Sequence, residues 1–301
     1  MSKILKVNKP SDYSAWVGQS DPHELISVIN YAELSPVRHS LNNYNVYGLF
    51  LQGKEEGMDL VYGTGKYDYS EGTLICVAPG QLGGKEDNGE FVNLTGWAVL
   101  FHPDILQGTG LEKGIKDFSF FDYRINEALH MTSEERDLMV TLIRQLEQEL
   151  RFPADTLQNR IIVGFINLLL RYAQRFYNRQ FITRTIVNND ILSRFESLLK
   201  DYFDNEFQLS KGLPSVQYCS EQLCMSPNYL SDVLKRTTGD TATHYIKSYV
   251  VQLAKNRLMA GMNSSEVAYY LGFDYPQHFT RMFKKLTGQT PMEYCRDRKN
   301  K

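Results

Sequence analysis

Two segments of the chain have matching sequences, 49 residues apart. The first is Ser231-Asp-Val-Leu-Lys-Arg-Thr-Thr-Gly-Asp-Thr-Ala-Thr-His-Tyr245, and the second is Thr280-Arg-Met-Phe-Lys-Lys-Leu-Thr-Gly-Gln-Thr-Pro-Met-Glu-Tyr294. Five of the fifteen aligned positions are identical: Lys235/Lys284, Thr238/Thr287, Gly239/Gly288, Thr241/Thr290 and Tyr245/Tyr294. A repeat of this length indicates one supersecondary unit that the chain uses twice.

Each copy is predicted to form a helix, a tight turn and a second helix. The four expected helices cover residues 216–223, 227–237, 264–271 and 276–287. Ser226 followed by Pro227 is a strong helix start, because serine caps the first turn and proline suits its first position. Ser264 is the expected cap of the third helix, and Gly288 ends the fourth. Helix, turn, helix is the unit that places its second helix in the major groove of DNA.

The second helix of each copy has an apolar side and a polar side. In the first copy the predicted outward residues are Asn228, Asp232 and Lys235, with Ser231 on the flank. In the second copy they are Gln277, Arg281 and Lys284, with His278 and Lys285 beside them. Asn, Gln and Arg can form paired hydrogen bonds with base edges, whereas Lys suits phosphates. A solvated surface would also be polar, but the recurrence of these polar residues at matched positions of the two copies favours DNA binding.

Residues 242–259 are predicted to form a long helix between the two copies, and Gly261 ends it. A rigid connector would set the spacing of the two second helices. One turn of B-DNA is roughly 34 Å, so the two units would occupy successive major grooves on one side of the duplex.

The charge distribution supports a polyanionic partner for this end of the chain. Residues 211–301 contain 13 Lys and Arg against 7 Asp and Glu, so their net charge is +6. The whole chain has a net charge of −2, and the preceding residues therefore carry −8. A basic end on an acidic body suits DNA, although charge alone would equally fit a mildly basic, solvated surface.

One run resembles the signature of the AraC/XylS family of bacterial transcription activators almost throughout: Leu271-Gly-Phe-Asp-Tyr-Pro-Gln-His-Phe-Thr-Arg-Met-Phe-Lys-Lys-Leu-Thr-Gly-Gln-Thr-Pro-Met-Glu-Tyr294. Residues 223–239 resemble the first helix-turn-helix of that family, and the resemblance covers about residues 213–296. It implies base contacts by Asn228, Ser231, Asp232, Pro276, Gln277, His278 and Arg281. The predicted phosphate contacts are Lys235, Arg236, Thr280, Lys284 and Lys285.

Two residues depart from the family pattern. Phosphates would repel Asp232, although its carboxylate could accept a hydrogen bond from a cytosine amino group. We therefore expect the first unit to add selectivity and the second unit to supply most of the affinity. Cys295 stands where the family commonly has an arginine, and Arg296 is placed to supply that charge one position later.

The first 130 residues are rich in β-branched and aromatic residues between short Gly and Pro turns. Strands are predicted at residues 45–51, 58–62, 72–78 and 96–101. Such short, regular strands favour a sandwich or barrel. The run Tyr67-Asp-Tyr-Ser-Glu-Gly-Thr-Leu-Ile-Cys-Val-Ala-Pro-Gly-Gln81 and the run Phe101-His-Pro-Asp104 loosely resemble the cupin-like sensor domain of many family members.

Two long helices are predicted to follow these strands. The first starts at Thr132 and has leucines every four residues until Pro153 stops it, and Asp155 is able to cap the second. The second helix has an apolar face that is wider than one barrel would cover, which predicts a homodimer. The expected dimerisation residues are Ile161, Phe165, Leu168, Leu169 and Tyr172.

These patterns predict an α+β protein of two domains. Residues 1–180 would be a cupin-like β-barrel with two long helices that senses a signal or dimerises, and residues 181–189 a polar linker. Residues 190–301 would be an all-helical DNA-binding domain with two helix-turn-helix units.

No catalytic residue, metal or cofactor is assigned. The His-X-His motif of enzymatic cupins is absent, and the N-terminal histidines are far apart in sequence: His23, His39, His102 and His130. The four cysteines, Cys76, Cys219, Cys224 and Cys295, form no CxxC pair, which suits a reducing cytoplasm. The most apolar stretch, residues 161–170, has about half of the length needed to span a bilayer. The N-terminus also lacks a signal-peptide pattern, so no membrane role is expected.

The leading hypothesis is a sequence-specific transcription regulator, and in particular an activator, that binds promoter DNA and recruits RNA polymerase. Its N-terminal domain would sense a small-molecule effector or dimerise. One rival is that the β domain is an enzyme joined to a DNA-binding appendage, in which His102 would be required for turnover. Another is that the N-terminal domain only dimerises. A roomy cavity with a few polar groups would favour sensing, and a cavity filled by side chains would favour simple dimerisation.

Overall fold

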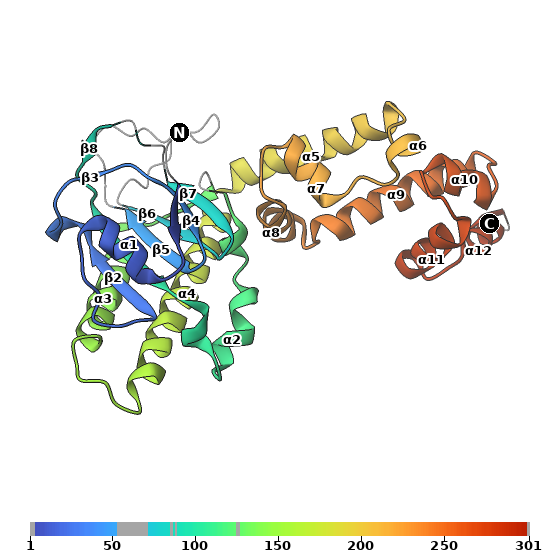
Figure 1. The fold of residues 1–301 in the computed structure, drawn as a ribbon. Helices are drawn as coiled ribbons and strands as arrows, with labels where there is room; N and C mark the ends of the chain where they lie inside the picture. Colours follow the sequence, from blue (N-terminus) through green and yellow to red (C-terminus); the bar gives the residue numbers. More distant parts are fainter. Residues whose placement is uncertain (1–3, 53–71, 85–86, 88, 125–126, 300–301) are drawn as a thin grey trace. The chain divides into compact units, whose positions relative to one another are not determined.

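The computed structural model describes residues 4–52, 72–84, 87, 89–124 and 127–299. The chain divides into two compact units, residues 1–183 and 184–301 (Figure 1). The N-terminal unit combines strands with helices, and the described part of the C-terminal unit is helical. The expected α+β class is therefore confirmed. None of the helices within these ranges is long and apolar enough to cross a membrane.

A five-stranded antiparallel sheet forms the largest layer of the N-terminal unit, in the order β10-β6-β5-β9-β2. Its inner strand β9, between β5 and β2, is buried from Trp97 to Phe101, because other layers cover both faces of the sheet. The strand bounds are β2 Ile26–Asn30, β5 Tyr47–Gln52, β6 Thr73–Val77, β9 Gly96–Phe101 and β10 Leu129–His130. Of the predicted strands, 45–51, 72–78 and 96–101 are thereby confirmed, and 58–62 lies outside the described residues.

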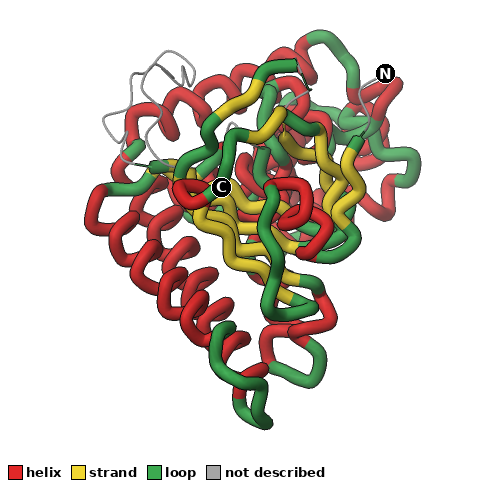
Figure 2. The backbone as a smooth tube through the Cα atoms, turned by 60° about the vertical axis from the view of Figure 1, so that its left-hand side comes forward, coloured by secondary structure: helices red, strands yellow, loops and turns green. Residues whose placement is uncertain are grey.

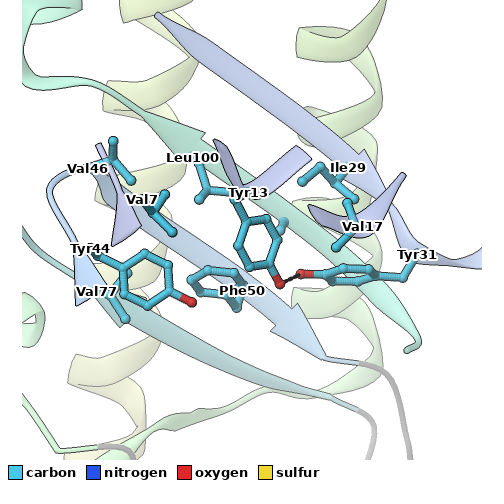
Figure 3. Packing of buried hydrophobic residues seen from close by; sticks show 11 residues of the cluster. Val7, Tyr13, Val17, Ile29, Tyr31, Tyr44, Val46, Phe50, Val77 and Leu100 are labelled. Carbon is cyan, nitrogen blue, oxygen red and sulfur yellow. Dashed lines mark hydrogen bonds between the residues drawn. The ribbon is translucent and has the colours of Figure 1, made fainter. Parts of the chain in front are cut away.

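Two smaller sheets accompany the large one. The strands β1 (Leu5–Val7), β4 (Leu41–Tyr44) and β7 (Gln81–Gly84) form one, and β3 (Val37–Arg38) and β8 (Phe91–Val92) form the other. A buried cluster joins the large sheet to β1, β4 and helix α1 (Pro10–Val17), and Figure 3 shows its aromatic rings at close range. The strands of the described residues form three separate sheets and no closed barrel. The cupin-like barrel that the sequence led us to expect is therefore not established.

Helices α3 (Ser133–Glu149) and α4 (Gln158–Thr183) pack against each other along one side of the strands (Figure 2). Thr132 caps α3 by accepting a hydrogen bond from the backbone N–H of Glu135, and Asp155 accepts from the N–H groups of Leu157 and Gln158. Both predicted helix starts are confirmed. Shorter helical segments connect β9 to β10: η2 Pro103–Leu106, α2 Gly110–Gly114, η3 Ile115–Asp117 and η4 Ser119–Asp122.

The C-terminal unit begins with α5, and α5 packs against α8. Helix α9 contacts α8 of the first copy of the repeat, and it also contacts α10, α11 and α12. The bounds are α5 Thr185–Asp204, α6 Gln208–Lys211, α7 Val216–Gln222, α8 Pro227–Thr238, α9 Ala242–Met259, α10 Ser264–Tyr270, α11 Pro276–Thr287 and α12 Pro291–Lys299. The two predicted helix-turn-helix units and the helix that connects them are confirmed.

The segment 181–189, expected to be an irregular linker, is instead helical on both sides of Arg184. Two polar residues of this segment, Arg184 and Asn188, are nearly fully buried, and Gln180 just before it is fully buried, whereas Thr183, Thr185 and Asn189 are exposed. The three buried residues lie at helical spacing with the buried side chain of Ile191. The division between the two units lies within this segment, between residues 183 and 184. A hydropathy pattern does not detect a buried face built from polar side chains, and for that reason the helical conformation of the segment was not expected.

Candidate nucleic-acid interface

The second helix-turn-helix unit consists of α10, the turn 271–275 and α11. Asn263, not Ser264, caps α10: its side chain accepts hydrogen bonds from the N–H groups of Ser265 and Glu266. The Glu266 carboxylate in turn accepts from the Asn263 N–H at 2.8 Å, which completes a capping box. The prediction of Ser264 as the cap was one residue late, because asparagine and serine are both good caps and occur side by side.

Helix α11 is anchored by aromatic packing. Phe279 and Phe283 are fully buried, and their ring centroids lie 5.7 Å apart in an edge-to-face arrangement. Pro276 opens the helix, and Gly288 ends it with φ = 80°, a conformation that favours glycine. The buried side of the helix is therefore defined by large rings, and the opposite side faces solvent.

The solvent side of α11 presents the polar residues that the sequence singled out. The side chains of Gln277, His278, Arg281, Lys284 and Lys285 are exposed. Gln277, Arg281 and Lys284 follow one another at intervals of four and three residues, so they share one face. Within the described part of the chain, the ion pairs include none formed by Arg281, Lys284 or Lys285. The three cations are thus available to an external anion.

Two other predicted residues of α11 have local roles. Pro276 is half-buried at the first turn, and the Thr280 hydroxyl donates a hydrogen bond to the Pro276 carbonyl at 3.0 Å. The prediction also missed Tyr275, which is 59% exposed and whose ring lies edge-on to His278 at 5.5 Å. An exposed tyrosine immediately before a helix-opening proline was the available signal. Its exposed side chain is therefore a further candidate for contact with DNA.

The first unit, formed by α7, the turn 223–226 and α8, is less open. Ser226 caps α8 as predicted, with its side chain accepting from the Tyr229 N–H at 3.2 Å. The side chains of Asn228, Ser231 and Asp232 are half-buried, and neither Asn228 nor Asp232 is without an interaction partner. The Ser231 hydroxyl oxygen accepts from the backbone N–H of Ala242, which ties α8 to the start of α9.

The two cationic residues near the end of α8, Lys235 and Arg236, differ from each other in their interaction partners. Lys235 is exposed, and the ion pairs among the described residues do not include it. Arg236 is exposed but already has an interaction partner. The geometry thus separates an open second unit from a more constrained first unit.

Helix α9 connects the two helix-turn-helix units and holds them in one rigid arrangement. Its buried residues Ile246, Val250, Ala254 and Leu258 recur every four residues and face the surrounding helices. At its N-terminal end, the Tyr245 hydroxyl donates a hydrogen bond to the Glu196 carboxylate on α5. Burial, together with this acceptor, raises the pKa of Tyr245 to about 12, so the hydroxyl stays protonated. At 18 residues, α9 is about 27 Å long, at 1.5 Å per residue.

The N-terminal unit contains a second candidate site, a cavity of about 270 Å³. Its walls include the aromatic side chains of Tyr13, Tyr31, Tyr44 and Phe50, several of which Figure 3 shows around the buried cluster. Two hydroxyl groups meet there, because Tyr13 and Tyr31 share a hydrogen bond of 2.7 Å. Burial raises the pKa of Tyr13 to about 12, so this phenol is uncharged at neutral pH.

The N-terminal histidines do not gather into a metal centre. His39 and His130 both contribute to the cavity lining, although they are far apart in sequence. The His102 ring accepts a hydrogen bond from the Asp104 N–H at 3.3 Å and caps η2, which is a structural role. Among the described residues, no group of three His, Cys, Asp or Glu side chains is placed to hold a metal ion.

The predicted dimerisation residues on α4 divide into two groups. Ile161 and Leu168 are about 40% exposed, and Phe165 and Tyr172 are half-buried. Leu169 is fully buried within its own unit, so its side chain cannot reach a partner and its assignment was wrong. The assignment failed because α4 is apolar on more than one face. Leu157, which is 54% exposed, extends the outer stripe by one turn instead.

Comparisons with known proteins agree with the C-terminal geometry. Residues 219–297 match the helix-turn-helix domain family. The uncharacterized transcriptional regulatory protein YesN of Bacillus subtilis is 34% identical over 131 residues, which cover 42% of this chain and 34% of that protein. The uncharacterized HTH-type transcriptional regulator YijO of Escherichia coli is 31% identical over 103 residues, covering 34% of this chain and 35% of the other. The chain thus spans about a third of the length of these relatives. The solved structure of ToxT from Vibrio cholerae is 14% identical, covering 90% of this chain and 96% of that one, with a TM-score of 0.30.

Proposed function

We propose that this chain, whose C-terminal unit is an AraC-type helix-turn-helix domain, is a transcription regulator that binds promoter DNA through both of its helix-turn-helix units. The observation that carries the proposal is the outer face of α11. There, the exposed Gln277 and Arg281 lie one turn apart, and Lys284 and Lys285 follow them, neither of which belongs to an ion pair among the described residues.

The chemistry of that face suits both parts of DNA recognition. Gln277 can form a bidentate pair with adenine, and Arg281 can form one with guanine, each worth about 1–3 kcal/mol of discrimination. Lys284 and Lys285 lie one turn further along α11, where ammonium groups would contact phosphates and release counterions. We therefore assign most of the binding affinity to the second unit.

The first unit would add selectivity. Asn228 and Asp232 are half-buried and already have interaction partners, so only a sequence that offers better contacts would engage them. The Asp232 carboxylate would repel a nearby phosphate and could accept a hydrogen bond from the amino group of cytosine. The proposal includes activation, in which a correctly placed dimer recruits RNA polymerase. Transcription from the bound promoter with purified polymerase, with and without the chain, tests that part.

We also propose that the N-terminal unit senses a small molecule. Its 270 Å³ cavity, whose walls combine aromatic side chains with several polar groups, is the feature that supports sensing over simple dimerisation. Within the described residues, His102 caps a turn, which gives no support to the rival proposal of an enzyme.

Dimerisation with a second copy of the chain would use the outer stripe of α4. Leu157, Ile161, Gly164 and Leu168 follow one another at intervals of four, three and four residues, the spacing of a coiled-coil seam. The space beside the Gly164 Cα is open, which would permit close approach of a second helix. Sedimentation of the intact chain tests this part, and a monomer at micromolar concentration would contradict it.

Mapping the DNA that the chain binds in its own cell is the direct test of the proposed function. We expect a small set of promoters that share two sequence elements about one helical turn apart. Binding without sequence preference, at any salt concentration, would refute the proposal.

A further inference from the structure

A short segment that precedes the two helix-turn-helix units contacts both of them. It comprises residues 202–212, which include the end of α5 and all of α6, and we call it the brace. Within the brace, the Tyr202 hydroxyl donates a hydrogen bond to the Gly212 carbonyl at 2.9 Å, and the rings of Tyr202 and Phe207 lie 5.7 Å apart. These contacts close the segment on itself, so it can act as one body.

The brace is attached to the first helix-turn-helix unit through α7. The ring of Tyr202, which is buried, lies edge-on to the ring of Tyr218 on α7, with their centroids 5.2 Å apart. Edge-to-face ring pairs of this kind stabilise a contact beyond the area that they bury. The Lys211 ammonium lies 5.8 Å from the centroid of the same Tyr218 ring, within range of a cation–π interaction. Helix α5, from which the brace extends, also packs against α8 of this unit.

The brace is attached to the second helix-turn-helix unit through Gln208, and Figure 1 shows α6 close to α10. Gln208 is buried, and its amide nitrogen donates a hydrogen bond to the carbonyl of Tyr270, the last residue of α10, at 3.2 Å. A Cβ atom on Gly272, in the turn between α10 and α11, would lie 2.3 Å from the Gln208 carbonyl oxygen. Only glycine permits so close an approach, so the backbone of α6 lies directly against this turn.

The brace therefore gives the two helix-turn-helix units a second connection besides α9. A unit that is attached along one helix can still rock about the axis of that helix, and a second attachment by another element opposes this motion. The amide oxygen of Gln208 has no hydrogen-bond partner among the described residues, and a buried acceptor in this state lowers stability. An apolar side chain of the same length would suit the core better, so the amide contributes chiefly through its hydrogen bond to the second unit.

We propose that the brace fixes the orientation of the second helix-turn-helix unit relative to the first, with Gln208 as its positioning residue, so that both units engage one DNA molecule together. This inference rests on the proposed function, in which each unit binds one DNA element. Two linked units bind two elements more tightly than either unit binds one, because the second binding step is intramolecular. The brace increases this advantage by holding the units in the orientation that the DNA requires.

Fluorescence anisotropy titrations of the full chain with three duplexes test the proposal. One duplex is a promoter site with both elements, and in each of the other two an unrelated sequence replaces one element. Gln208→Met keeps the length of the side chain and removes its hydrogen bond to Tyr270. This variant should bind the two-element duplex about tenfold more weakly than the wild type, the cost of fixing about one residue's backbone again on binding. Its affinity for each one-element duplex should be unchanged.

A pair of glycine variants provides a matched comparison. Gly272→Ala places a methyl group against the Gln208 carbonyl and should lower the two-element affinity in the same way. Gly288→Ala introduces the same backbone strain, because φ is 83° at Gly272 and 80° at Gly288, but the space around its Cβ is open. It should leave the ratio of two-element to one-element affinity unchanged. Equal weakening of all three duplexes by Gln208→Met, or no weakening of the two-element duplex, would overturn the proposal.

Distances between two spin labels measure the same property without DNA. One label is attached to Cys224, which is exposed in the turn of the first unit, and the other to the exposed position of Tyr269→Cys on α10, in a chain that also contains Cys295→Ser. We expect a narrow distance distribution in this background and a broader one after Gln208→Met. Equal widths, together with promoter binding, would refute the brace alone. The expected broadening in a chain that binds no promoter DNA would support the brace and refute the proposed function.

Discussion

Replacement of Arg281 provides the sharpest test of the proposal that α11 recognises DNA. The Arg281 side chain is exposed, and the ion pairs of the described residues do not include it, so its removal should change folding stability by less than about 0.5 kcal/mol. A bidentate contact from arginine to guanine is worth about 1–3 kcal/mol, and 1.4 kcal/mol is a factor of ten. Arg281→Ala should therefore weaken binding to the cognate promoter by about 5- to 150-fold.

The same change should relax specificity at one base pair. In electrophoretic mobility shift or fluorescence anisotropy titrations, the wild-type chain would discriminate against a promoter altered at that base pair, and Arg281→Ala would bind both promoters alike. Arg281→Lys is the matched control, because it keeps the charge but loses the planar fork that pairs with guanine. We expect it to retain phosphate attraction and to lose most of the discrimination.

The comparison with Lys284→Ala makes the assignment refutable. Loss of one phosphate contact should weaken binding to all sequences alike and reduce the slope of log affinity against log salt by about 0.9. If Arg281→Ala behaved in this way, with every base preference intact, then Arg281 would contact the backbone. The proposed placement of α11 in the major groove would then be wrong.

Three further changes test the architecture that supports these contacts. Asn263→Ala should destabilise the C-terminal unit by about 1 kcal/mol through loss of the α10 cap, measured by urea unfolding, and no change would contradict the capping geometry. Phe283→Ala should cost about 3–5 kcal/mol in the same assay, because the ring is fully buried; a cost below 1 kcal/mol would show that it is not a core residue. Ile161→Asp should convert the proposed dimer to a monomer in sedimentation, whereas Asn167→Asp on a neighbouring face should not, and equal effects would exclude the α4 stripe as the interface.

Local signals explain why much of the C-terminal unit could be predicted from sequence. Ser226, Pro276 and Gly288 each act within one helical turn, so the expected bounds of α8, α9 and α11 agree with the structure to within one residue. The outward face of α11 follows from the period of its two buried phenylalanines. Because the unit occurs twice, the helix bounds predicted for one copy also support those predicted for the other.

Features that depend on tertiary packing were harder to predict. The buried polar residues around Arg184 were interpreted as a linker, and Leu169 was placed on an outer face although its own unit covers it. The cavity could not be predicted, because its lining combines side chains from α1 and from strands of all three sheets. Only the folded chain brings the rings of Tyr13, Tyr31 and Tyr44 together around one cavity.

The rigid support that α9 gives to both helix-turn-helix units limits which sequence changes a DNA-binding site could tolerate. A base substitution in one element changes one contact, and the remaining contacts still hold the protein in register. An insertion of five base pairs between the elements would rotate the second element by about half a turn of the duplex, out of reach of a unit that cannot rotate with it. Functional binding sites of this protein should therefore tolerate point changes but not changes in length between their two halves.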